Sequence, residues 1–560
     1  MSSRRAWGAR AALAAALAVL AVPASAPAQD PAEQPPFGGE PIGPLVAPSS
    51  ELTPPPGFRL SAKEAKEIAI GTDEAREALD DGNLVIDAGT RDGHWEVTLS
   101  DDGDPGALIV IDDARGEVIE AWTGSQVETR LARGYPGAVA GIVNAVWIWI
   151  PLCLLFLAPF VDLRRPFRLL HLDLAALLAF SVSLYFFNRG EIGVSAPLAY
   201  PVLGYLFGRL ALAGFRPAER DEKLLPHLGP RLLIGAIAAL VALHAVIAVW
   251  EAKVIDVGLA SVIGADRVAD GDFLYGAGSA SGQPIRVDVY GPINYLAYVP
   301  FEQLFPWSGG WDSVPAARAA SLSFDLLTAL VLFALGGRLR RGAEGRTLGL
   351  ALAFAWLAYP FTLYGLGSSF NDMLVALLVT ASLLVLSSAP ARGALAALAG
   401  LTKFGPLALV PLLAAGTGER RARPLAVFSL SFLAVAALAT ALVIDGSGLR
   451  ELYDRSLGYQ AGRGSPFSLW GQAPSLEPLQ TLATVFAIGF GAALFFVPGS
   501  RTPIQVAALA GATLIAIQVP ATHWFYSYCL WFAPLALVAL MAAQRGPLPT
   551  ARPSDNKAAR

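Results

Sequence analysis

The fold of this chain follows from one polar stretch, Asp256-Val-Gly-Leu-Ala-Ser-Val-Ile-Gly-Ala-Asp266-Arg-Val-Ala-Asp270-Gly-Asp272-Phe-Leu-Tyr275. It comes directly after an apolar run, and apolar sequence resumes soon after Asp288-Val-Tyr290. Five aspartates therefore lie where the chain leaves an apolar environment and returns to it. Ionisable groups at a membrane face indicate a functional site by default. We interpret residues 251–290 as a long polar loop at a membrane surface.

The composition indicates a membrane protein. The chain has 560 residues, of which 54% are hydrophobic and only 15% are charged, and its mean hydropathy is +0.51. Apolar runs recur at the length of about 17–25 residues that a bilayer crossing requires. The sequence therefore predicts an all-α polytopic protein of the plasma membrane, in contact with membrane lipids. The net charge of -4 argues against a nucleic-acid partner.

No cofactor is indicated by the sequence. Cys153 and Cys529 both lie in apolar runs, where a cysteine behaves as a small hydrophobic residue. The five histidines are scattered and form no metal-ligand spacing. A requirement for a divalent metal stays an open alternative, although no residue pattern supports it.

The N-terminus has the pattern of a secretory signal. Arg4 and Arg5 precede an apolar run, and Ala26-Pro-Ala28 offers small residues for cleavage. We expect a signal peptide over residues 1–28, with an uncleaved anchor as the alternative. Residues 29–57 are rich in proline and small polar residues and are expected to form a disordered linker. Either reading places the next segment outside the cell.

Residues 58–134 are expected to form a small extracytoplasmic α+β domain. Ser61 and Glu64 have the spacing of a capping box at the start of a helix. The runs 95–99, 107–111 and 116–122 have the composition of strands. This order resembles the PepSY-like domains of secreted and membrane-anchored bacterial proteins. The resemblance implies an interaction or regulatory module, because the segment carries no catalytic motif.

The membrane part is expected to contain about eleven spans. Three form an N-terminal group within residues 138–228, eight belong to a core over residues 229–545, and residues 546–560 form a disordered cytoplasmic tail. The expected spans are 139–160, 171–188, 198–215, 231–251, 314–337, 347–366, 371–388, 424–444, 478–497, 503–520 and 523–543. Basic clusters mark the short loops that we expect to be cytoplasmic, among them Arg164 and Arg165, Arg338 to Arg346, and Arg420 to Arg423. With these loops inside, the N-terminal domain lies outside and the C-terminus lies in the cytoplasm.

Two segments do not fit as full spans. Residues 392–415 are too short for two crossings, and Gly400 to Pro406 breaks them with Lys403 at the break. We expect a re-entrant hairpin there, because irregular backbone at membrane depth is tolerated where it is buried or lines a polar cavity. We expect residues 291–307 to lie along the outer surface as an amphipathic segment that Pro292, Pro300 and Pro306 interrupt.

Four polar stretches fall on the outer side in this topology and could converge on one site. They are the loop 256–295, the segment Ser368-Ser-Phe-Asn371-Asp372, the loop 445–476 with Arg463 and Trp470, and His523-Trp-Phe-Tyr526-Ser-Tyr528. A passive scaffold has no physical reason to collect polar groups on one side of the membrane. This distribution therefore favours a surface enzyme.

The pattern resembles the first outer loop of the GT-C glycosyltransferases. Asp256 stands at a helix exit, Gly271 follows fifteen residues later, and then come Leu274 and Tyr275. The polyprenol-phosphate-mannose-dependent mannosyltransferases of actinobacteria are similar over roughly residues 230–543. The resemblance implies a GT-C-like fold, an aspartate as catalytic base, a lipid-phosphate sugar as donor and a cell-envelope acceptor. The three additional N-terminal spans and the soluble domain depart from that pattern, so acceptor identity does not transfer.

Glycosyl transfer needs a base for the acceptor hydroxyl and cationic groups for the departing phosphate. Asp256 is the expected base and Asp288 the alternative. Lys403 and Arg463 are expected to hold the phosphate, with His523 assisting. Further substrate contacts are expected from Tyr290, Asn371, Asp372, Trp470 and Tyr526.

Each residue also has a structural reading. Asp256, Asn371 and Asp372 could cap helices, Lys403 could form a structural ion pair, and Arg463 could be a loop charge. His523 could anchor the chain at the membrane interface. The class of protein has alternatives as well: a transporter or channel for an envelope precursor, since broken helices with charges mark substrate paths, or a lipid-linked glycan ligase or polymerase.

Overall fold

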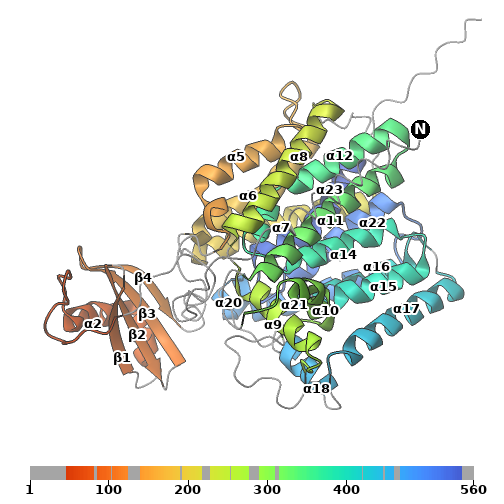
Figure 1. Cartoon of the computed structure of the whole chain (residues 1–560). Coiled ribbons are helices and arrows are strands. Elements are labelled where there is room, and N and C mark those ends of the chain that lie inside the picture. The colour runs from red at the N-terminus through yellow and green to blue at the C-terminus, as the bar shows by residue number, and fades with distance from the viewer. Residues whose placement is uncertain are drawn as a thin grey trace, which may run out of the picture.

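The computed structural model describes most of the chain (Figure 1). The described residues are 46–80, 85–91, 93–101, 104–123, 139–188, 192–216, 228–252, 254–275, 289–308, 314–418, 420–444, 448–458 and 467–544. The expected signal peptide, the tail 546–560, Asp288 and Arg463 lie outside these ranges. A unit with a β-sheet comes first, and a larger helical body follows it.

The N-terminal unit is a four-stranded antiparallel sheet with two helices packed on it. The strands follow one another in the order β1-β2-β3-β4, and α2 and α3 pack against them. The elements are α2 (Ala62–Ile70), α3 (Asp73–Asp80), β1 (Val85–Arg91), β2 (His94–Asp101), β3 (Asp104–Asp112) and β4 (Glu117–Thr123). Trp95 is fully buried in this core, and its Nε1 donates to Asp113 at 3.1 Å.

The local sequence signals of this unit are confirmed. Ser61 caps α2 and forms the expected capping box with Glu64. The three expected strands correspond to β2, β3 and β4, whereas β1 and the short helix α3 were not predicted. Val46, which we expected within the linker, forms an isolated bridge with Thr90 of β1.

The rest of the chain is helical (Figure 1). Its first part comprises η2 (Gly141–Asn144), α5 (Val146–Leu157), α6 (Leu169–Asn188), α7 (Ile192–Phe215), α8 (Pro230–Val246), η3 (Ile247–Glu251), α9 (Asp256–Ala269), α10 (Pro292–Leu304), α11 (Pro315–Leu339), α12 (Gly342–Ala358) and α13 (Pro360–Gly367). The second part comprises α14 (Asp372–Leu384), α15 (Ala389–Gly400), η4 (Gly405–Leu409), α16 (Val410–Ala415), α17 (Ala422–Ala441), α18 (Gly448–Leu452), η5 (Tyr453–Gly458), α20 (Leu469–Gln472), η6 (Pro474–Leu476), α21 (Glu477–Ala493), α22 (Pro503–Gln518), η7 (Tyr526–Tyr528) and α23 (Cys529–Ala542).

The expected number of eleven membrane spans is not confirmed. Within the described residues, five helices are long and apolar enough to cross a membrane: α6, α7, α8 with η3, α11 and α17. A sixth span results if α12 and α13 count as one, although a bend of 52° separates them. The other expected spans correspond to shorter helices, such as the 12 residues of α5 and the 13 of α14. The multi-pass character of the protein is nevertheless plain.

The chain breaks where the hairpin was expected. Helix α15 ends at Gly400, η4 begins at Gly405, and Lys403 lies in the turn between them. The segment 291–307 differs from its prediction in one respect, because α10 runs without interruption from Pro292 to Leu304 and contains Pro300. Pro292 occupies the first turn, where a proline fits a helix without loss of a hydrogen bond.

The interpretation of residues 251–290 as a polar loop is wrong over its first half. Asp256 to Ala269 form the helix α9, and the eight residues from Gly258 to Ala265 are buried. The small side chains of α9 allow it to pack very close to α10, and this close packing buries them. A Cβ atom on Gly264 would lie 2.2 Å from the ring of Tyr295. The helix was not predicted because the ends of the segment are polar and many side chains in its centre are small rather than strongly apolar.

Candidate functional site

A cavity of about 830 Å³ lies within the helical body and collects several of the predicted site residues. Its polar lining includes Asp256, Tyr290, Asp372, Lys403 and His523. Four of these residues come from three stretches that the sequence predicted on the outer side of the membrane, and Lys403 comes from the expected hairpin. A concave, mostly apolar site with a few convergent polar groups is the usual form of a small-molecule site.

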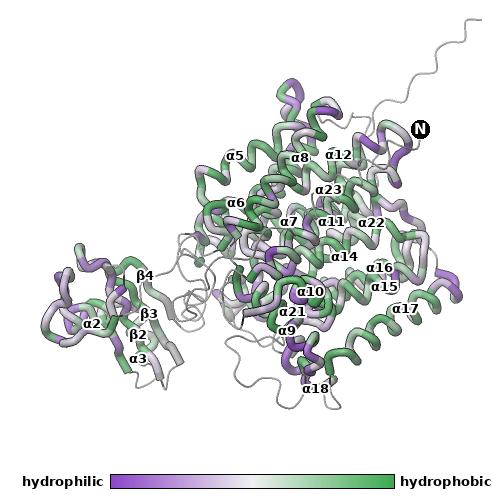
Figure 2. Tube along the Cα trace, in the orientation of Figure 1, coloured by the Kyte–Doolittle hydropathy of each residue, from purple (hydrophilic) through white to green (hydrophobic). Residues whose placement is uncertain are grey.

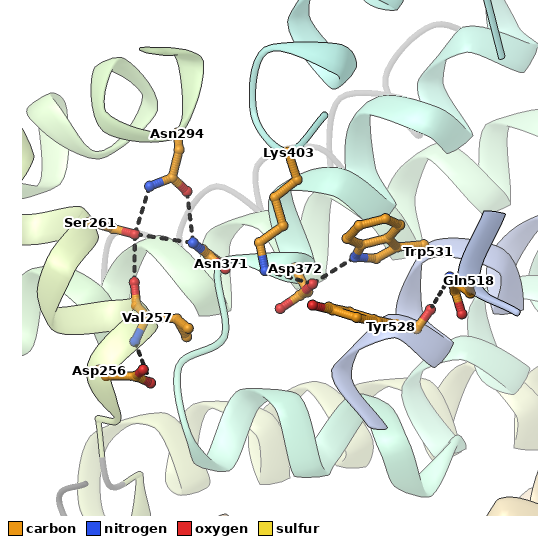
Figure 3. Close-up of polar contacts among 10 residues, drawn as sticks. All are labelled: Asp256, Val257, Ser261, Asn294, Asn371, Asp372, Lys403, Gln518, Tyr528 and Trp531. Carbon is orange, nitrogen blue, oxygen red and sulfur yellow. Dashed lines mark hydrogen bonds and ion pairs between the residues drawn. The ribbon is translucent and has the colours of Figure 1, made fainter. Parts of the chain in front are cut away.

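Lys403 and Asp372 form an ion pair at the polar end of the cavity (Figure 3). The Nζ atom of Lys403 lies 2.9 Å from Oδ1 of Asp372. The same oxygen accepts a hydrogen bond from Nε1 of Trp531 at 2.6 Å. Asp372 is buried, and the Lys403 side chain is 11% exposed. The carboxylate therefore offsets the cost of a cation in an apolar environment and leaves the ammonium partly accessible.

Aromatic rings surround the Lys403 ammonium. Its Nζ lies 5.2 Å from the ring centre of Tyr290, 5.7 Å from that of Tyr528 and 6.0 Å from that of Trp531. Rings at this distance attract a cation through their π-faces. Tyr290 is itself held in place, because its carbonyl accepts from the Tyr275 hydroxyl and its N–H donates to Tyr295 Oη at 3.2 Å. The ion pair with Asp372 and the surrounding rings therefore hold the Lys403 ammonium in one position.

Burial raises the pKa of the Tyr290 hydroxyl well above its usual value of 10, and the carboxylates of Asp256 and Asp372 add to this shift. Asp256, Asp372 and Tyr290 all line the same cavity. The hydroxyl stays protonated near neutral pH and can act as a hydrogen-bond donor but not as a base.

Asp256 is the first residue of α9. Its Oδ1 accepts a hydrogen bond from the backbone N–H of Val257 at 2.8 Å. A carboxylate in the first turn of a helix is favoured by the helix dipole. The N-cap of α9 is Ile255, and no side chain forms a cap hydrogen bond there. Asp256 instead occupies the first helical position and lines the cavity.

The segment before Asp256 is anchored by buried polar contacts. Near the end of α8, Nδ1 of His244 lies 2.5 Å from Asp325 Oδ2, and its Nε2 lies 2.8 Å from the carbonyl oxygen of Leu357. One turn further, Nη1 of Arg318 donates to the carbonyl of Val249 at 3.0 Å. These contacts tie η3 to α11 and α12 and so limit the movement of the chain that leads to the carboxylate.

A buried amide network joins the helix of Asp256 to the helix of Asp372 (Figure 3). Nδ2 of Asn371 donates to Oδ1 of Asn294 at 3.0 Å, and Nδ2 of Asn294 donates to Oγ of Ser261 at 2.9 Å. Ser261 in turn donates to the carbonyl of Val257 at 2.7 Å. Asn371 does not line the cavity, although it directly precedes Asp372, which does. Ser261 and Asn294 were not predicted, and no sequence motif distinguishes them.

The other predicted site residues lie in different environments. The ring of His523 lines the cavity and lies 5.3 Å from that of Phe467. Trp470 does not line it, and its Nε1 donates to the carbonyl of Val519 at 2.8 Å. Tyr526 is buried, with its hydroxyl 2.7 Å from Ser183 Oγ and 2.8 Å from Ser195 Oγ. Asp288 and Arg463 lie outside the described residues.

From its polar end the cavity continues between apolar helices. Leu407, Ala408 and Pro411 of η4 and α16 line one side of this apolar arm, and Ile488 and Gly491 of α21 line another. Ile488 is 66% exposed on the outside of the helical body. The apolar arm is therefore lined at one side by a residue that is also exposed on the surface of the helical body.

Among the described residues, no group of three or more His, Cys, Asp or Glu side chains is arranged to hold a metal ion. The charged groups of the cavity are the two carboxylates and the paired ammonium, with His523 beside them. This set can bind a phosphate and accept a proton.

A cavity with two carboxylates, a paired ammonium and a largely apolar lining, set among apolar helices, fits a membrane enzyme. Residues 289–545 match the family model of glycosyltransferase family 87. The match supports a GT-C membrane glycosyltransferase. The matched segment contains Tyr290, Asp372, Lys403 and His523 and begins after Asp256. No curated protein and no solved structure matches the chain.

Proposed function

We propose that this membrane glycosyltransferase transfers a sugar from a polyprenyl phosphate to an acceptor hydroxyl on the outer face of the membrane, with inversion at the anomeric carbon. The cavity is the observation that carries the proposal. It combines a carboxylate, a paired ammonium and an apolar arm lined by the exposed Ile488. A polyprenyl-phosphate sugar has the matching parts: a sugar, a phosphate and a long hydrocarbon chain.

Lys403 would hold the phosphate of the donor. An ammonium is a compact charge with three N–H donors, and the bond to Asp372 uses one of them. The others can stabilise the negative charge that grows on the phosphate as it departs. Asp372 would keep the ammonium charged and oriented. His523, from the stretch 523–528, would assist in binding the phosphate. Arg463 remains a further proposed phosphate ligand.

Asp256 would act as the base. In a single displacement, the acceptor oxygen attacks the anomeric carbon from the face opposite the phosphate. The bond between that carbon and the phosphate oxygen breaks, the polyprenyl phosphate leaves as an anion, and the hydroxyl proton passes to the carboxylate. Attack from the opposite face inverts the configuration. Asp288 is the second candidate for the same role.

The sugar is proposed to be mannose or another hexose or pentose, and the acceptor a glycan, lipid or protein of the cell envelope. Tyr290, Tyr528 and Trp531 offer ring faces beside the phosphate position, where a sugar ring would lie. A lipid-linked glycan ligase or polymerase would use the same chemistry on a larger acceptor. A transporter is less well supported, because the family match covers the cavity residues from Tyr290 to His523.

The apolar arm provides the test. A Cβ on Gly491 would lie 3.2 Å from the carbonyl oxygen of Ala408, across the arm. Gly491→Leu should therefore raise the KM for a long-chain polyprenyl-phosphate mannose at least tenfold and change the KM for a short-chain analogue much less. Gly489→Leu on the same helix is the control, because nothing lies within 4 Å of its Cβ position. Equal effects on both donors, or no transfer from any polyprenyl-phosphate sugar by the wild-type protein, would refute the proposed donor.

A further inference from the structure

Two turns on the other side of the helical body are joined by close backbone contacts. The turn after α16 and the turn before α22 meet where the N–H of Arg501 donates to the carbonyl of Thr417 at 3.2 Å. Nη2 of Arg420 donates to the carbonyl of Gly499 at 3.0 Å. Gly418 makes the approach possible, since its φ is +120° and a Cβ there would lie 2.6 Å from the Gly499 oxygen. The two turns thus form one surface.

Arg501 places a buried positive charge under this surface. The residue is 5% exposed. Its Nη1 donates to the carbonyl of Leu494 at 2.8 Å and its Nη2 to that of Pro498 at 3.0 Å, while its Nε has no hydrogen-bond partner. Burial and the nearby charge of Arg420 lower the pKa of Arg501. A nearby anion would relieve both effects.

A cleft lies over the same turns and is lined by Gly418, Arg420, Arg421 and Pro424. Arg420, Arg421 and Arg423 are exposed. In the ranges that the structure covers, these arginines have no carboxylate partner within ion-pair distance; Glu419 lies outside those ranges. Guanidinium groups bind phosphate oxygens through paired N–H donors. The cleft therefore has the charge and the donors for a phosphate.

The cleft and Lys403, at the polar end of the cavity, lie at opposite ends of the segment Gly405–Ala415 formed by η4 and α16, whose Pro411 lines the apolar part of the cavity. Helix α17 has 20 residues, which corresponds to about 30 Å at 1.5 Å per residue. Its far end leads to Val443, whose carbonyl accepts from the N–H of Leu274 near α9. Figure 2 shows hydrophilic residues at the start of α17 and a hydrophobic run along the rest of the helix. The cleft thus belongs to the opposite membrane face.

We propose that the cleft formed by Arg420 and Arg421 binds the phosphate headgroup of an anionic phospholipid of that membrane leaflet. The surface beside it distinguishes a lipid from free phosphate. Helix α17 is the least buried of the candidate spans, at 11%, and Leu430, Leu433 and Leu438 are each more than 60% exposed. Acyl chains can lie along this helix while the headgroup occupies the cleft. Basic pockets at membrane helices are a known form of lipid recognition.

The proposal is tested on the full-length protein in mild detergent by native mass spectrometry. The probes are phosphatidylglycerol and phosphatidylcholine with the same acyl chains. The variant Arg420→Gln/Arg421→Gln should bind phosphatidylglycerol about tenfold more weakly, and binding of phosphatidylcholine should not change. Arg421→Gln alone leaves the Arg420 contact with Gly499 intact and should weaken binding about threefold.

The control removes two exposed arginines from another basic turn, in the variant Arg341→Gln/Arg346→Gln, and should leave phosphatidylglycerol binding within about twofold. An equal loss in this control would mean a diffuse effect of charge and would overturn the site. Complete displacement of phosphatidylglycerol by inorganic phosphate would show a site for the free anion instead of the lipid. Because the readout is lipid binding, the result does not depend on the proposed sugar transfer.

Discussion

The Nζ atom of Lys403 lies 2.9 Å from Oδ1 of Asp372, and this pair stands at the break between α15 and η4. The lysine comes from the broken segment and the aspartate from the start of α14. The sequence allowed either a phosphate ligand or a structural ion pair; the ion pair is present, and phosphate binding by the same residue is our proposal. The pairing keeps a cation at membrane depth, and the 11% exposure of the lysine side chain leaves it open to the cavity.

The first prediction concerns this pair. Asp372→Asn should lower the free energy of unfolding by about 3–5 kcal/mol, because it leaves the buried ammonium without its counter-charge. Thermal unfolding in detergent measures the effect. Asp454→Asn is the control, since its pair with Arg450 is exposed on both sides and should contribute less than about 1 kcal/mol. Similar melting temperatures for Asp372→Asn and the control would contradict the importance of the pair.

The second prediction concerns the packing behind Lys403. Gly291 precedes α10, and a Cβ there would lie 2.1 Å from the carbonyl oxygen of Leu401. Gly291→Ala should therefore destabilise the protein by about 1–3 kcal/mol through overpacking. It should also reduce activity, because the carbonyls of Leu401 and Thr402 accept hydrogen bonds from the start of α10. Gly235→Ala in α8 has open space around the new Cβ and serves as the reference. Equal melting temperatures in the two variants would show that the protein accommodates the new Cβ beside Leu401 without strain, against this prediction.

The third prediction concerns pH. Burial raises the folded-state pKa of Tyr290 above the value of about 10 in the unfolded chain. Its contribution to stability is therefore fully present below about pH 10 and is lost as the pH rises through the folded-state pKa. Tyr290→Phe should make the melting temperature fall less steeply above about pH 10, whereas Tyr453→Phe, which changes an exposed ring, should not. A shift of the activity profile near neutral pH in Tyr290→Phe would argue against a permanently protonated hydroxyl.

The fourth prediction concerns the network of Ser261, Asn294 and Asn371. Asn294→Ala removes the nearer acceptor of the Asn371 amide, leaves Ser261 Oγ at 3.4 Å as the other, and should cost about 1–3 kcal/mol. Because the network joins the helices that carry the two carboxylates, kcat should fall more than tenfold while the KM for the donor changes little. Asn294→Asp keeps the acceptor for Asn371 and should restore part of the activity. A loss of stability with unchanged kcat would mean that the network has no positioning role.

The sequence predicted local features where the signal was contained in a few residues. The Ser61 and Glu64 capping box is one example, and the chain break at Lys403 is another, because glycine, proline and a lysine in an apolar run can hardly form a continuous span. Charge placement also put Asp256, Tyr290, Asp372 and His523 on the outer side and Lys403 at the break of a re-entrant hairpin, and all five line the cavity.

Features that depend on packing could not be predicted. Helix α9 was missed because its buried residues are small, such as Gly258, Ser261 and Gly264, and they resemble a loop in composition. In the aromatic run 523–528 the sequence cannot show which rings face the cavity. Tyr528 lines it, while Tyr526 turns to Ser183 and Ser195. Trp531 supplies the second bond to Asp372 from within a uniformly apolar helix.

The most direct measurement is sugar transfer from radiolabelled polyprenyl-phosphate mannose in membranes that contain the wild type, Asp256→Asn or Asp270→Asn. Asp256 lines the cavity, whereas Asp270 lies exposed just after the other end of α9 and undergoes the same change of charge. We predict transfer by the wild type and by Asp270→Asn, and a loss of at least about a hundredfold in normally folded Asp256→Asn, as for removal of a general base. Equal transfer by all three would contradict the assignment of Asp256 as the base.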